Sequence, residues 1–523
     1  MESDPAPHKL LDLLDSYTKK ISLSVHHAAA TSATRQEEGK AASSVNESWT
    51  EEDTERTLAD CSFEEYLGLK FYLDDPLPKI KQACHQNDDN TKEQTKENSA
   101  IRLFVDHEFP THRPTSVTNP ESSEGCCSNR DGTVMVTPGI ITDSNCRDFS
   151  LAGGKRTRRI RHYMRMARRE KAGDGKGGWK WIRGSSMPNR VLFSSSPDGA
   201  CNIRPRNIIQ GRVGNCGFCS GFASLASHAP RTFRDAFGKF SIDCLSSCGA
   251  VSLRLYPYPN SRPRYILMDD YVLCDYETSS SYNFESPSLH SSIKEDLWIR
   301  LIEKAFVKIQ GSYASLDGHY KYNSLYRHPA RALQLFTGAP VALEIHYHLP
   351  RQKDPHTNCG EDSNTSKDYN IVFDLLVQTQ GRFARVVHCR STTMGLRSNH
   401  GYSLLWIGSA AGVKLVCLRN PHGRGSYEGP YGYRSDIWKL QGDVLASLLN
   451  LDFFEQCQQT GWVTWRYAEN GIKKICNRQS FDSTMAVANN DDDDGIFFME
   501  FSVFAECFPT TTIVGPLGCA DFN

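Results

Sequence analysis

The chain alternates between polar stretches and segments with regular apolar spacing, and the regular segments predict its folded parts. Residues 28–60 and 86–99 are dominated by Ser, Thr, Glu, Asn and Lys without apolar periodicity, which is typical of linkers or disorder. Residues 8–25 carry apolar side chains at helical spacing. We therefore expect an amphipathic helix there that packs on a neighbouring element or, less commonly, binds a partner. From residue 189 onward the pattern becomes that of a globular protein.

The globular part mixes helical and strand patterns. Residues 218–227 are rich in Ala, Leu and small side chains after a glycine-rich approach, which predicts a helix. Residues 399–407 and 413–421 have strand patterns and are joined by a predicted turn at 408–412. Segments after about residue 339 are richer in strand patterns than those before it. The expected fold class is therefore α+β.

Composition is compatible with a large soluble protein of a reducing compartment. The 523 residues suggest two to four domain-sized units, and a net charge of −1 gives no overall attraction to nucleic acid or membrane. No apolar run approaches the roughly 18 residues that span a bilayer, and the N-terminus lacks the basic and apolar regions of a secretory signal. The 18 cysteines are scattered, so we expect free thiols and a cytoplasmic location.

A basic segment departs from this neutral average. Residues 155–171 contain nine Lys or Arg among seventeen positions and are flanked by glycines. Such a block serves as a nuclear localisation signal, contacts anionic lipid or nucleic acid, or is a solvated charged helix. The sequence leaves these readings open, so a nuclear location is the alternative to a cytoplasmic one.

A glutamine and a cysteine six residues apart form the first candidate chemistry. Cys216 lies at the glycine-rich start of the predicted helix, and Gln210 precedes it. The unpaired N–H groups and the dipole at a helix N-terminus favour a thiolate over a thiol, which makes a cysteine nucleophilic. A glutamine amide placed just upstream can donate a hydrogen bond to the oxyanion of an attacked carbonyl. The pair has the layout of a thiol protease site.

The predicted hairpin supplies a base for this nucleophile. Folding it about Ala410 and Ala411 places His400 and Asn420 opposite each other, within one residue of register. Directly opposed residues of an antiparallel pair have Cβ atoms about 4.5–5.5 Å apart. An Asn oxygen there can hold one imidazole nitrogen as N–H and leave the other free to accept the cysteine proton. An ordinary histidine at a strand end is the plain alternative when the hairpin is considered without Gln210 and Cys216.

Six ordered motifs resemble the calpain family of papain-like cysteine proteases. They are Gln210–Cys216, with Asn215 where the family has Asp, Leu297–Tyr313, Asn399–Ser403, Leu418–Gly423, Asp493–Phe504 and Leu103–Pro110. The resemblance implies a two-lobed papain-like fold with the active site in the cleft between the lobes. It also implies Cys216 as the nucleophile, His400 as general base and acid, Asn420 as the residue that orients His400, and Gln210 as the oxyanion donor.

The resemblance also suggests how the chain is divided. We expect an N-terminal extension, an opening segment with a basic glycine-flanked insertion, a first lobe with the cysteine helix, a second β-rich lobe with the histidine hairpin, and a short tail. These correspond to residues 1–100, 101–188, 189–338, 339–515 and 516–523. Neither an appended β-sandwich nor an EF-hand pattern is found in the sequence, so the regulatory modules of conventional calpains are expected to be absent.

Cys219 offers two rival interpretations of the cysteine pair. The papain signature Cys-Gly-Ser-Cys would make the second cysteine the nucleophile, but Gln210 would then lie nine residues upstream. A Cys-x-x-Cys redox pair would leave His400 and Asn420 unexplained. The six-residue spacing selects Cys216, with Cys219 as a small buried helix residue. One helical turn between the two thiols also suggests reversible inactivation by mild oxidants.

Several family positions differ in this chain. The family's Trp after the nucleophile is Gly217, and the Trp that covers the His–Asn hydrogen bond is His422, a polar replacement that we expect to leave the bond more exposed. Most positions of the family's calcium-binding carboxylates are lost, and Asp494 is a weak candidate that remains. Those lost are Asn207, Ala314, Ser426, Tyr433 and Ile496. Calcium prefers about six to eight oxygen ligands, so we expect no required cofactor and reduced or absent calcium dependence.

The sequence therefore predicts a cysteine endopeptidase that hydrolyses peptide bonds of intracellular proteins through an acyl-enzyme. Its expected partners are protein substrates and inhibitor proteins. The alternative is a catalytically silent calpain-like scaffold or binding protein, against which the intact set of Cys216, His400 and Asn420 argues.

Overall fold

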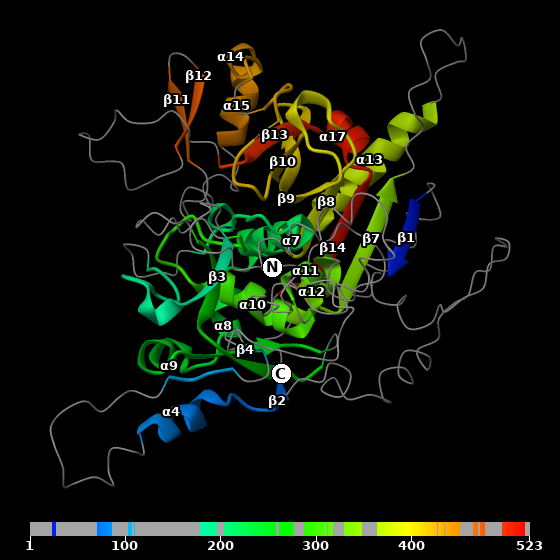
Figure 1. Ribbon diagram of the computed structural model, residues 1–523. Helices are drawn as coiled ribbons and strands as arrows, with labels where there is room; N and C mark the ends of the chain where they lie inside the picture. The colour runs from blue at the N-terminus through cyan, green and yellow to red at the C-terminus, as the bar shows by residue number, and fades with distance from the viewer. Residues whose placement is uncertain are drawn as a thin grey trace, which may run out of the picture.

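The protein mixes helices and antiparallel sheets in its computed structural model (Figure 1), which confirms the α+β class. The structure describes residues 23–27, 71–85, 103–106, 109, 178–195, 203–257, 261–276, 287–310, 312–316, 329–347, 363–425, 427–432, 435–449, 464–468, 471–475 and 494–517. The basic segment 155–171 lies outside the described residues.

The largest sheet of the described chain has seven antiparallel strands in the order β1-β7-β14-β8-β9-β10-β13. Its strands are β1 (Leu23–His27), β7 (Val341–Tyr347), β8 (Ala384–Cys389), β9 (His400–Ala410), β10 (Val413–Arg419), β13 (Ile496–Glu500) and β14 (Thr510–Gly515). The strand β14 follows all the others in sequence, yet it lies between β7 and β8. The predicted hairpin corresponds to β9 and β10, with Ala411 and Gly412 between them.

Three smaller sheets complete the strand content of the described residues. The first has the order β2-β5-β4, and the others pair β3 with β6 and β11 with β12. Their bounds are β2 (Phe71–Tyr72), β3 (Gly178–Arg183), β4 (Ala250–Leu255), β5 (Arg264–Asp269), β6 (Tyr271–Tyr276), β11 (Thr464–Ala468) and β12 (Gly471–Ile475).

The helices of the described chain are mostly short, and α7 and α10 are central to the fold. Figure 1 shows α7 beside the large sheet, with α10 and α12 below it. The α-helices are α4 (Leu77–His85), α7 (Cys216–His228), α8 (Arg231–Ala236), α9 (Ser241–Ser247), α10 (Trp298–Gln310), α11 (Tyr313–Leu316), α12 (Pro329–Thr337), α13 (Ser363–Gln378), α14 (Ile437–Leu440), α15 (Gly442–Leu449) and α17 (Phe501–Cys507). The short 3-10 helices are η1 (Gly184–Ser186), η2 (Pro205–Asn207) and η3 (Thr393–Gly395).

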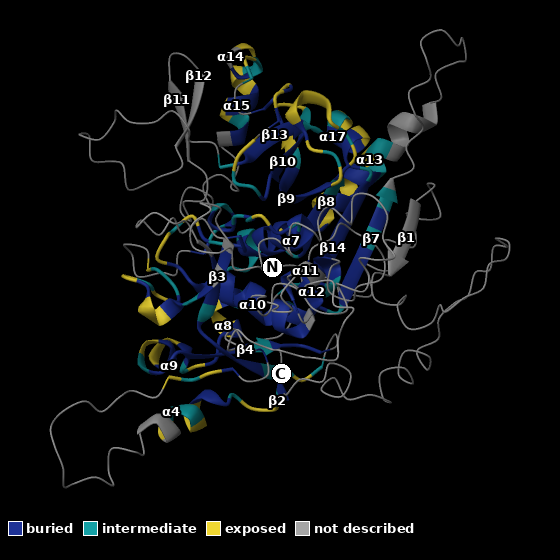
Figure 2. Cartoon of the chain, in the orientation of Figure 1, coloured by how far each residue is buried: buried dark blue, intermediate teal, exposed yellow. Residues whose placement is uncertain are grey.

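An aromatic cluster holds α7 against α10 and α12. The rings of Phe218 and Phe222 stack with centroids 4.4 Å apart, and Phe222 meets Phe336 edge to face at 5.0 Å. Phe306 packs against Phe218 at 4.9 Å. Such contacts add to the stabilisation from buried apolar area. The nucleophile candidate is therefore carried by a helix that is buried along most of its length (Figure 2).

The large sheet has a separate hydrophobic cluster on each face. The first-face cluster, which includes α13 and α17, contains Leu404, Ile407, Val416, Leu418 and Phe497. The second-face cluster, which includes α14 and α15, contains Leu405, Trp406, Leu415, Cys417 and Phe498. Because both faces are covered, β9 and β10 are buried almost throughout, and dark blue dominates this part of Figure 2.

A β-bulge interrupts the pairing of β9 with β10. Cys417 pairs with Trp406, but the next residue, Leu418, pairs with Leu404, so Leu405 is extra on β9. Leu405 and Trp406 accordingly belong to the same face although they are consecutive. An inserted residue of this kind reverses the face on which all later side chains of that strand lie.

The expected register of the hairpin is wrong by two residues. Its turn is centred on Ala411 and Gly412 rather than on Ala410 and Ala411, and with the bulge Arg419 pairs with Ser403. The register continues from there to Tyr402 for Asn420, so His400 is two residues further along β9. A diagonal neighbour at i, j±2 lies on the same face, about 7–8 Å away between Cα atoms. The two residues therefore still share a face.

The N-terminal region is described only in part. Of the amphipathic helix expected over residues 8–25, residues 23–25 form a strand with β7 instead, and the rest lies outside the described chain. The alternating sequence of β1 suits an edge strand better than a helix end. Residues 71–85, within the expected extension, pack on the fold: β2 pairs with β5, and Leu77 of α4 is buried against Cys244.

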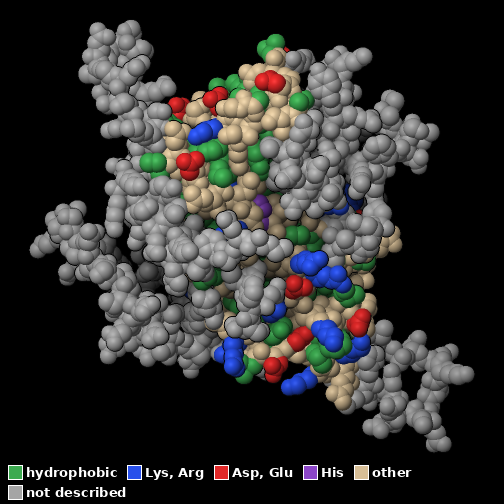
Figure 3. Space-filling model, turned by 180° about the vertical axis from the view of Figure 1, so that it is seen from behind, with side chains coloured by type: hydrophobic (Ala, Val, Ile, Leu, Met, Phe, Trp, Pro, Cys, Tyr) green, Lys and Arg blue, Asp and Glu red, His purple; other side chains and the backbone are tan. Residues whose placement is uncertain are grey.

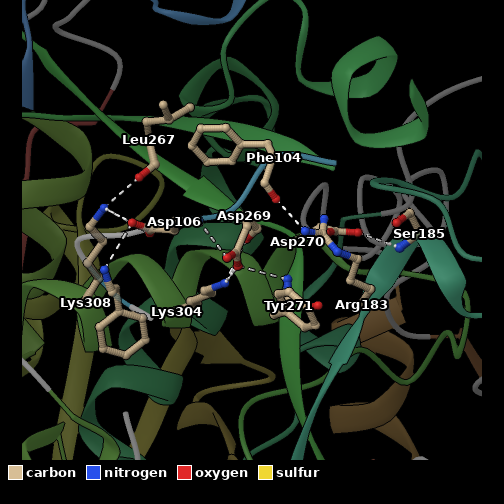
Figure 4. Close-up of polar contacts among 11 residues, drawn as sticks. Phe104, Asp106, Arg183, Ser185, Leu267, Asp269, Asp270, Tyr271, Lys304 and Lys308 are labelled. Atoms are coloured by element: carbon tan, nitrogen blue, oxygen red, sulfur yellow. Dashed lines mark hydrogen bonds and ion pairs between the residues drawn. The ribbon is translucent and has the colours of Figure 1, made fainter. Parts of the chain in front are cut away.

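Buried ion pairs hold residues 103–106 against the part of the molecule formed by β3, β5, β6 and α10 (Figure 4). The pairs are Asp106 with Lys308, Asp269 with Lys304, and Asp270 with Arg183. Lys308 Nζ lies 3.0 Å from both carboxylate oxygens of Asp106, and the Asp106 backbone N–H donates to Asp269 Oδ2 at 3.0 Å. The network joins the opening segment to β3, to the β5–β6 turn and to α10.

Charges of both signs are interspersed on the face seen from behind. Lys and Arg side chains are most numerous towards the end of the molecule that carries α9 and α4, with Asp and Glu side chains among them (Figure 3). Within the described residues, no helix combines the length and apolar character needed to cross a membrane.

Candidate active site

Cys216 is the first residue of α7 and is 2 % exposed. The residue before it, Asn215, precedes the helix, and its carbonyl accepts the hydrogen bond from Cys219 N–H that opens it. The backbone N–H of Gly401 donates to Cys216 Sγ at 3.3 Å. Both the helix N-terminus and this donor favour negative charge on the sulfur. Gly401 directly follows His400, so the thiol lies beside the start of β9.

His400 and Asn420 make the hydrogen bond that the sequence predicts, with His400 Nε2 3.0 Å from Asn420 Oδ1. The Asn420 Nδ2 group donates to the carbonyls of Arg424 and Gly425, both at 2.9 Å, which turns Oδ1 towards His400. An amide oxygen can only accept, so His400 Nε2 carries the hydrogen and Nδ1 is left as the base. His400 is 6 % exposed and Asn420 1 %.

The bulge in β9 is the feature that permits this contact. If the pairing were regular, with Leu418 opposite Leu405, Asn420 would pair with Ser403, and His400, three residues from Ser403, would lie on the opposite face of the sheet. With the bulge, both side chains lie on the same face as Leu404 and Leu418. The residue before β13 also holds Asn420, because the Asn420 N–H donates to Gly495 O at 2.9 Å.

His422 covers the His400–Asn420 pair. Its ring stacks on that of His400 with centroids 4.7 Å apart and an interplanar angle of 7°. Its backbone N–H also donates to Asn420 Oδ1 at 3.1 Å. Burial, together with the charges of Arg397, Arg424 and Arg419, lowers the pKa of His422 to about 4, so the ring is neutral near pH 7. The expectation that a polar replacement leaves the hydrogen bond exposed is therefore wrong, since a flat neutral imidazole covers it.

Gln210 lies on a loop that contacts both sides of the site. Its backbone N–H donates to Pro421 O at 2.8 Å, which ties the loop to the residue after Asn420. Its side-chain Nε2 donates to Val213 O at 2.8 Å and retains a second hydrogen for another acceptor. The residue is 8 % exposed. The amide is thus held against Val213, three residues before the start of α7, and its role as an oxyanion donor stays a prediction.

Cys219 packs behind the site. It is fully buried, and its Sγ lies 3.8 Å from the carbonyl oxygens of both Ile208 and Pro421. Burial raises the pKa of this thiol far above its usual range. A neutral thiol is a poor nucleophile and a poor resolving group. The structure therefore argues against Cys219 as the nucleophile and against a readily formed disulfide with Cys216.

Three hydrogen bonds at the site are not predicted from the sequence. Ser220 Oγ donates to Gly401 O at 3.0 Å, and Ser403 Oγ donates to Ser220 O at 2.8 Å, which fastens α7 to β9. Asn215 Nδ2 donates to Oε1 of Glu303, from α10, at 2.6 Å. Ser220 lies four residues after Cys216 and Ser403 three after His400. The position of Ser220 one helical turn after Cys216 could have indicated its contact with β9. No sequence spacing indicates the contact with Glu303.

The residues at the family's calcium positions are a poor fit for calcium where the structure describes them. Ile496 is fully buried in the second-face cluster, and Asn207 is 1 % exposed. Asp494 Oδ1 accepts a hydrogen bond from the Ile496 N–H at 3.0 Å. Ser426 and Tyr433 lie outside the described residues. Across the described chain, no three His, Cys, Asp or Glu side chains are grouped as ligands for one metal ion.

Known proteins with similar sequences are cysteine proteases. The calpain family cysteine protease model matches residues 162–451, more than half of the chain. The calpain-type cysteine protease ADL1 of Oryza sativa subsp. japonica is 24% identical over 276 residues, which are 50% of this chain and 11% of that protein. Calpain-7 of Homo sapiens is 25% identical over 295 residues, which are 52% of this chain and 31% of that protein. The chain thus spans a third or less of the length of either relative.

Proposed function

Because the chain belongs to the calpain family of cysteine proteases, we propose that it is an endopeptidase that cleaves protein substrates through a thioester on Cys216. The observation that carries the proposal is the contact between His400 Nε2 and Asn420 Oδ1 beside a cysteine at a helix N-terminus. Together these groups supply a nucleophile, a base and a residue that orients the base.

The chemistry follows from the roles of these atoms. His400 Nδ1 accepts the proton of Cys216, and the thiolate attacks the scissile carbonyl. The negative charge moves to the carbonyl oxygen, where the Gln210 amide and the Cys216 N–H donate hydrogen bonds. The C–N bond breaks as His400 gives its proton to the leaving amine. Water, deprotonated by His400, then attacks the thioester and releases the carboxylate and free Cys216.

We propose a two-lobed molecule with this site in the cleft between its lobes. In support, Cys216 begins the helix packed on α10 and α12, whereas His400 begins β9 and Asn420 follows β10, two strands whose apolar side chains belong to other hydrophobic clusters. Polar contacts join the two parts beside the site, among them Ser220 Oγ to Gly401 O, Ser403 Oγ to Ser220 O, and the Gln210 N–H to Pro421 O.

We also propose that catalysis needs little or no calcium. Two observations support this. Ile496 is buried in a hydrophobic cluster, and Asp494 Oδ1 accepts a hydrogen bond from the backbone N–H of Ile496. Calcium sites gain affinity from their number of carboxylates, and these positions supply one. Casein cleavage should therefore persist in excess EGTA at a rate close to that in millimolar calcium. Strict dependence with tight stoichiometric binding of the metal would refute the proposal.

The decisive experiment is labelling of the purified full chain with the epoxide E-64, followed by peptide mapping. We expect an adduct on Cys216 and cleavage of an unstructured protein. Cys216→Ala and His400→Ala should each abolish cleavage, and Asn420→Ala should leave residual activity because it only orients His400. No adduct and no cleavage under any condition would identify the chain as a silent scaffold.

A further inference from the structure

Glu303 is a buried carboxyl that contacts two functional segments at once. It lies on α10 and is fully buried. Its Oε1 accepts a hydrogen bond from Asn215 Nδ2 at 2.6 Å, and its Oε2 accepts one from the backbone N–H of Leu289 at 2.9 Å. A buried carboxyl with two such bonds is fixed in position, because breaking either bond leaves a polar group without a partner.

Each partner of Glu303 controls one side of the reaction site. Asn215 immediately precedes Cys216 and begins the hydrogen bonding of α7. Leu289 belongs to a short segment that pairs with the loop carrying Gln210. In that pairing His290 and Ile209 exchange backbone hydrogen bonds of 2.9 and 3.0 Å. One carboxyl therefore links the start of the nucleophile's helix to the segment behind the oxyanion loop.

The oxyanion loop has little freedom to move independently of that segment. The N–H groups of Arg212 and Val213 donate to Pro287 O at 2.8 and 3.1 Å. A Cβ at Gly211 would lie only 2.4 Å from the carbonyl oxygens of Pro287 and Ser288, so loop and segment are in direct backbone contact. A shift of Leu289 must consequently carry Gln210 with it.

We propose that Glu303 is a positioning residue for peptide cleavage: by holding Asn215 and Leu289 together, it sets the placement of the Gln210 amide relative to Cys216. The inference rests on the proposed function. Glu303 touches neither substrate nor reacting atoms, and its effect is on the geometry of the oxyanion site. A displacement of about 1 Å in such a site is sufficient to reduce the rate by on the order of a hundredfold.

The surroundings of Glu303 favour its neutral form. Asn215 and Ser288 hydrogen-bond to it, Arg300 of its own helix is the nearby cation, and Tyr313 and Cys219 are neutral neighbours. Burial outweighs the hydrogen bonds and raises the pKa of Glu303 to about 8. Glutamine has the same shape as this neutral acid. In Glu303→Gln the amide oxygen accepts from the Leu289 N–H, and the amide NH2 donates to Asn215 Oδ1 once the side-chain amide of Asn215 has turned over, so both segments stay linked.

The test compares four forms of the full chain: wild type, Glu303→Ala, Asn215→Ala and the conservative Glu303→Gln. Active sites are counted by titration with the epoxide, and kcat and KM are measured per titrated site on a fluorogenic peptide. We expect the two alanine variants to lose at least tenfold in kcat, with KM within about threefold of wild type. Glu303→Gln should keep kcat within about threefold. Alkylation by iodoacetamide forms no oxyanion. In the alanine variants, the rate at which it alkylates Cys216 should therefore fall by a smaller factor than kcat.

The outcomes separate three possibilities. If both alanine variants have lower melting temperatures and fewer titratable sites but unchanged kcat per site, Glu303 is only structural and the inference is overturned. If Glu303→Ala does not fold, Asn215→Ala removes the same contact from the other side and decides the matter. If the wild-type chain neither reacts with the epoxide nor cleaves the peptide, the proposed function itself fails.

Discussion

At the scale of single residues, His422 stacks a second imidazole ring on that of His400, the proposed base. The two ring centroids are 4.7 Å apart, so the His422 ring shields the His400–Asn420 hydrogen bond from water on that side. His422→Ala should open it to water and lower kcat by on the order of tenfold through loosened orientation of His400. His422→Trp should keep kcat near wild type, since an indole covers the same bond. Steady-state kinetics per titrated site checks this, and an alanine variant equal to wild type would contradict it.

The same residue should contribute to acid sensitivity. The pKa of His422 is lowered from 6.5 to about 4 in the folded protein. As pH falls from about 6.5 towards 4, the unfolded chain takes up a proton there and the folded chain does not, so the free energy of unfolding decreases. His422→Phe lacks this group. Its melting temperature should fall less between pH 7 and pH 4.5 than that of wild type, as measured by calorimetry. An equal fall in both would contradict the assignment.

Cys219 should prove dispensable for chemistry. Its thiol faces the carbonyls of Ile208 and Pro421 and not the substrate side. Cys219→Ser should retain epoxide labelling of Cys216, with at most a few-fold loss of kcat from altered packing. Oxidation by dilute peroxide should inactivate both forms equally, without a Cys216–Cys219 disulfide in the mapped peptides, because the buried neutral thiol is a poor resolving group. If peroxide inactivated Cys219→Ser but not wild type, Cys219 would act as a resolving thiol and this prediction would be wrong.

At the scale of elements, the contact of α7 with β9 depends on two reciprocal serine hydrogen bonds. Ser220→Ala and Ser403→Ala should each reduce the free energy of unfolding by about 1–3 kcal/mol, because each removes a buried hydrogen bond. The loss in the double variant should differ from the sum of the two single losses, since the residues are in contact. Urea titration measures this. Ser246→Ala on the exposed face of α9 is the control and should change little. Additive losses would show that the two serines act independently.

These elements show how far the sequence could predict the site. Hydrophobic periodicity and turn residues were sufficient to place α7 and the β9–β10 hairpin, and the spacing of Gln210 from Cys216 identified the nucleophile candidate. The bulge at Leu405 could not be predicted, because both faces of β9 are buried and its apolar run has no alternation to mark a reversal. The role of Glu303 was equally hidden, since it depends on contacts between distant segments.

At the scale of the whole molecule, the buried network of Figure 4 makes the opening segment part of the fold. Asp106→Ala would leave the Lys308 ammonium buried without its carboxylate. We expect a loss of about 3–5 kcal/mol in the free energy of unfolding. Asp106→Ala combined with Lys308→Met should recover most of the loss, because the unpaired charge is removed. Chemical denaturation distinguishes the two variants, and equal stability of both would contradict a role for the ion pair.

The position of β14 in the large sheet has a consequence for biosynthesis. Until residues 510–515 have left the ribosome, β7 and β8 have no strand to join them, and the sheet exists at best as two separate halves. Domains otherwise begin to fold as they emerge, from the N-terminal side. Until then, the unpaired edges of β7 and β8 are open to pairing with each other or with strands of other chains. Translation of β14, rather than of Cys216, His400 and Asn420, is therefore the event that allows the large sheet to close.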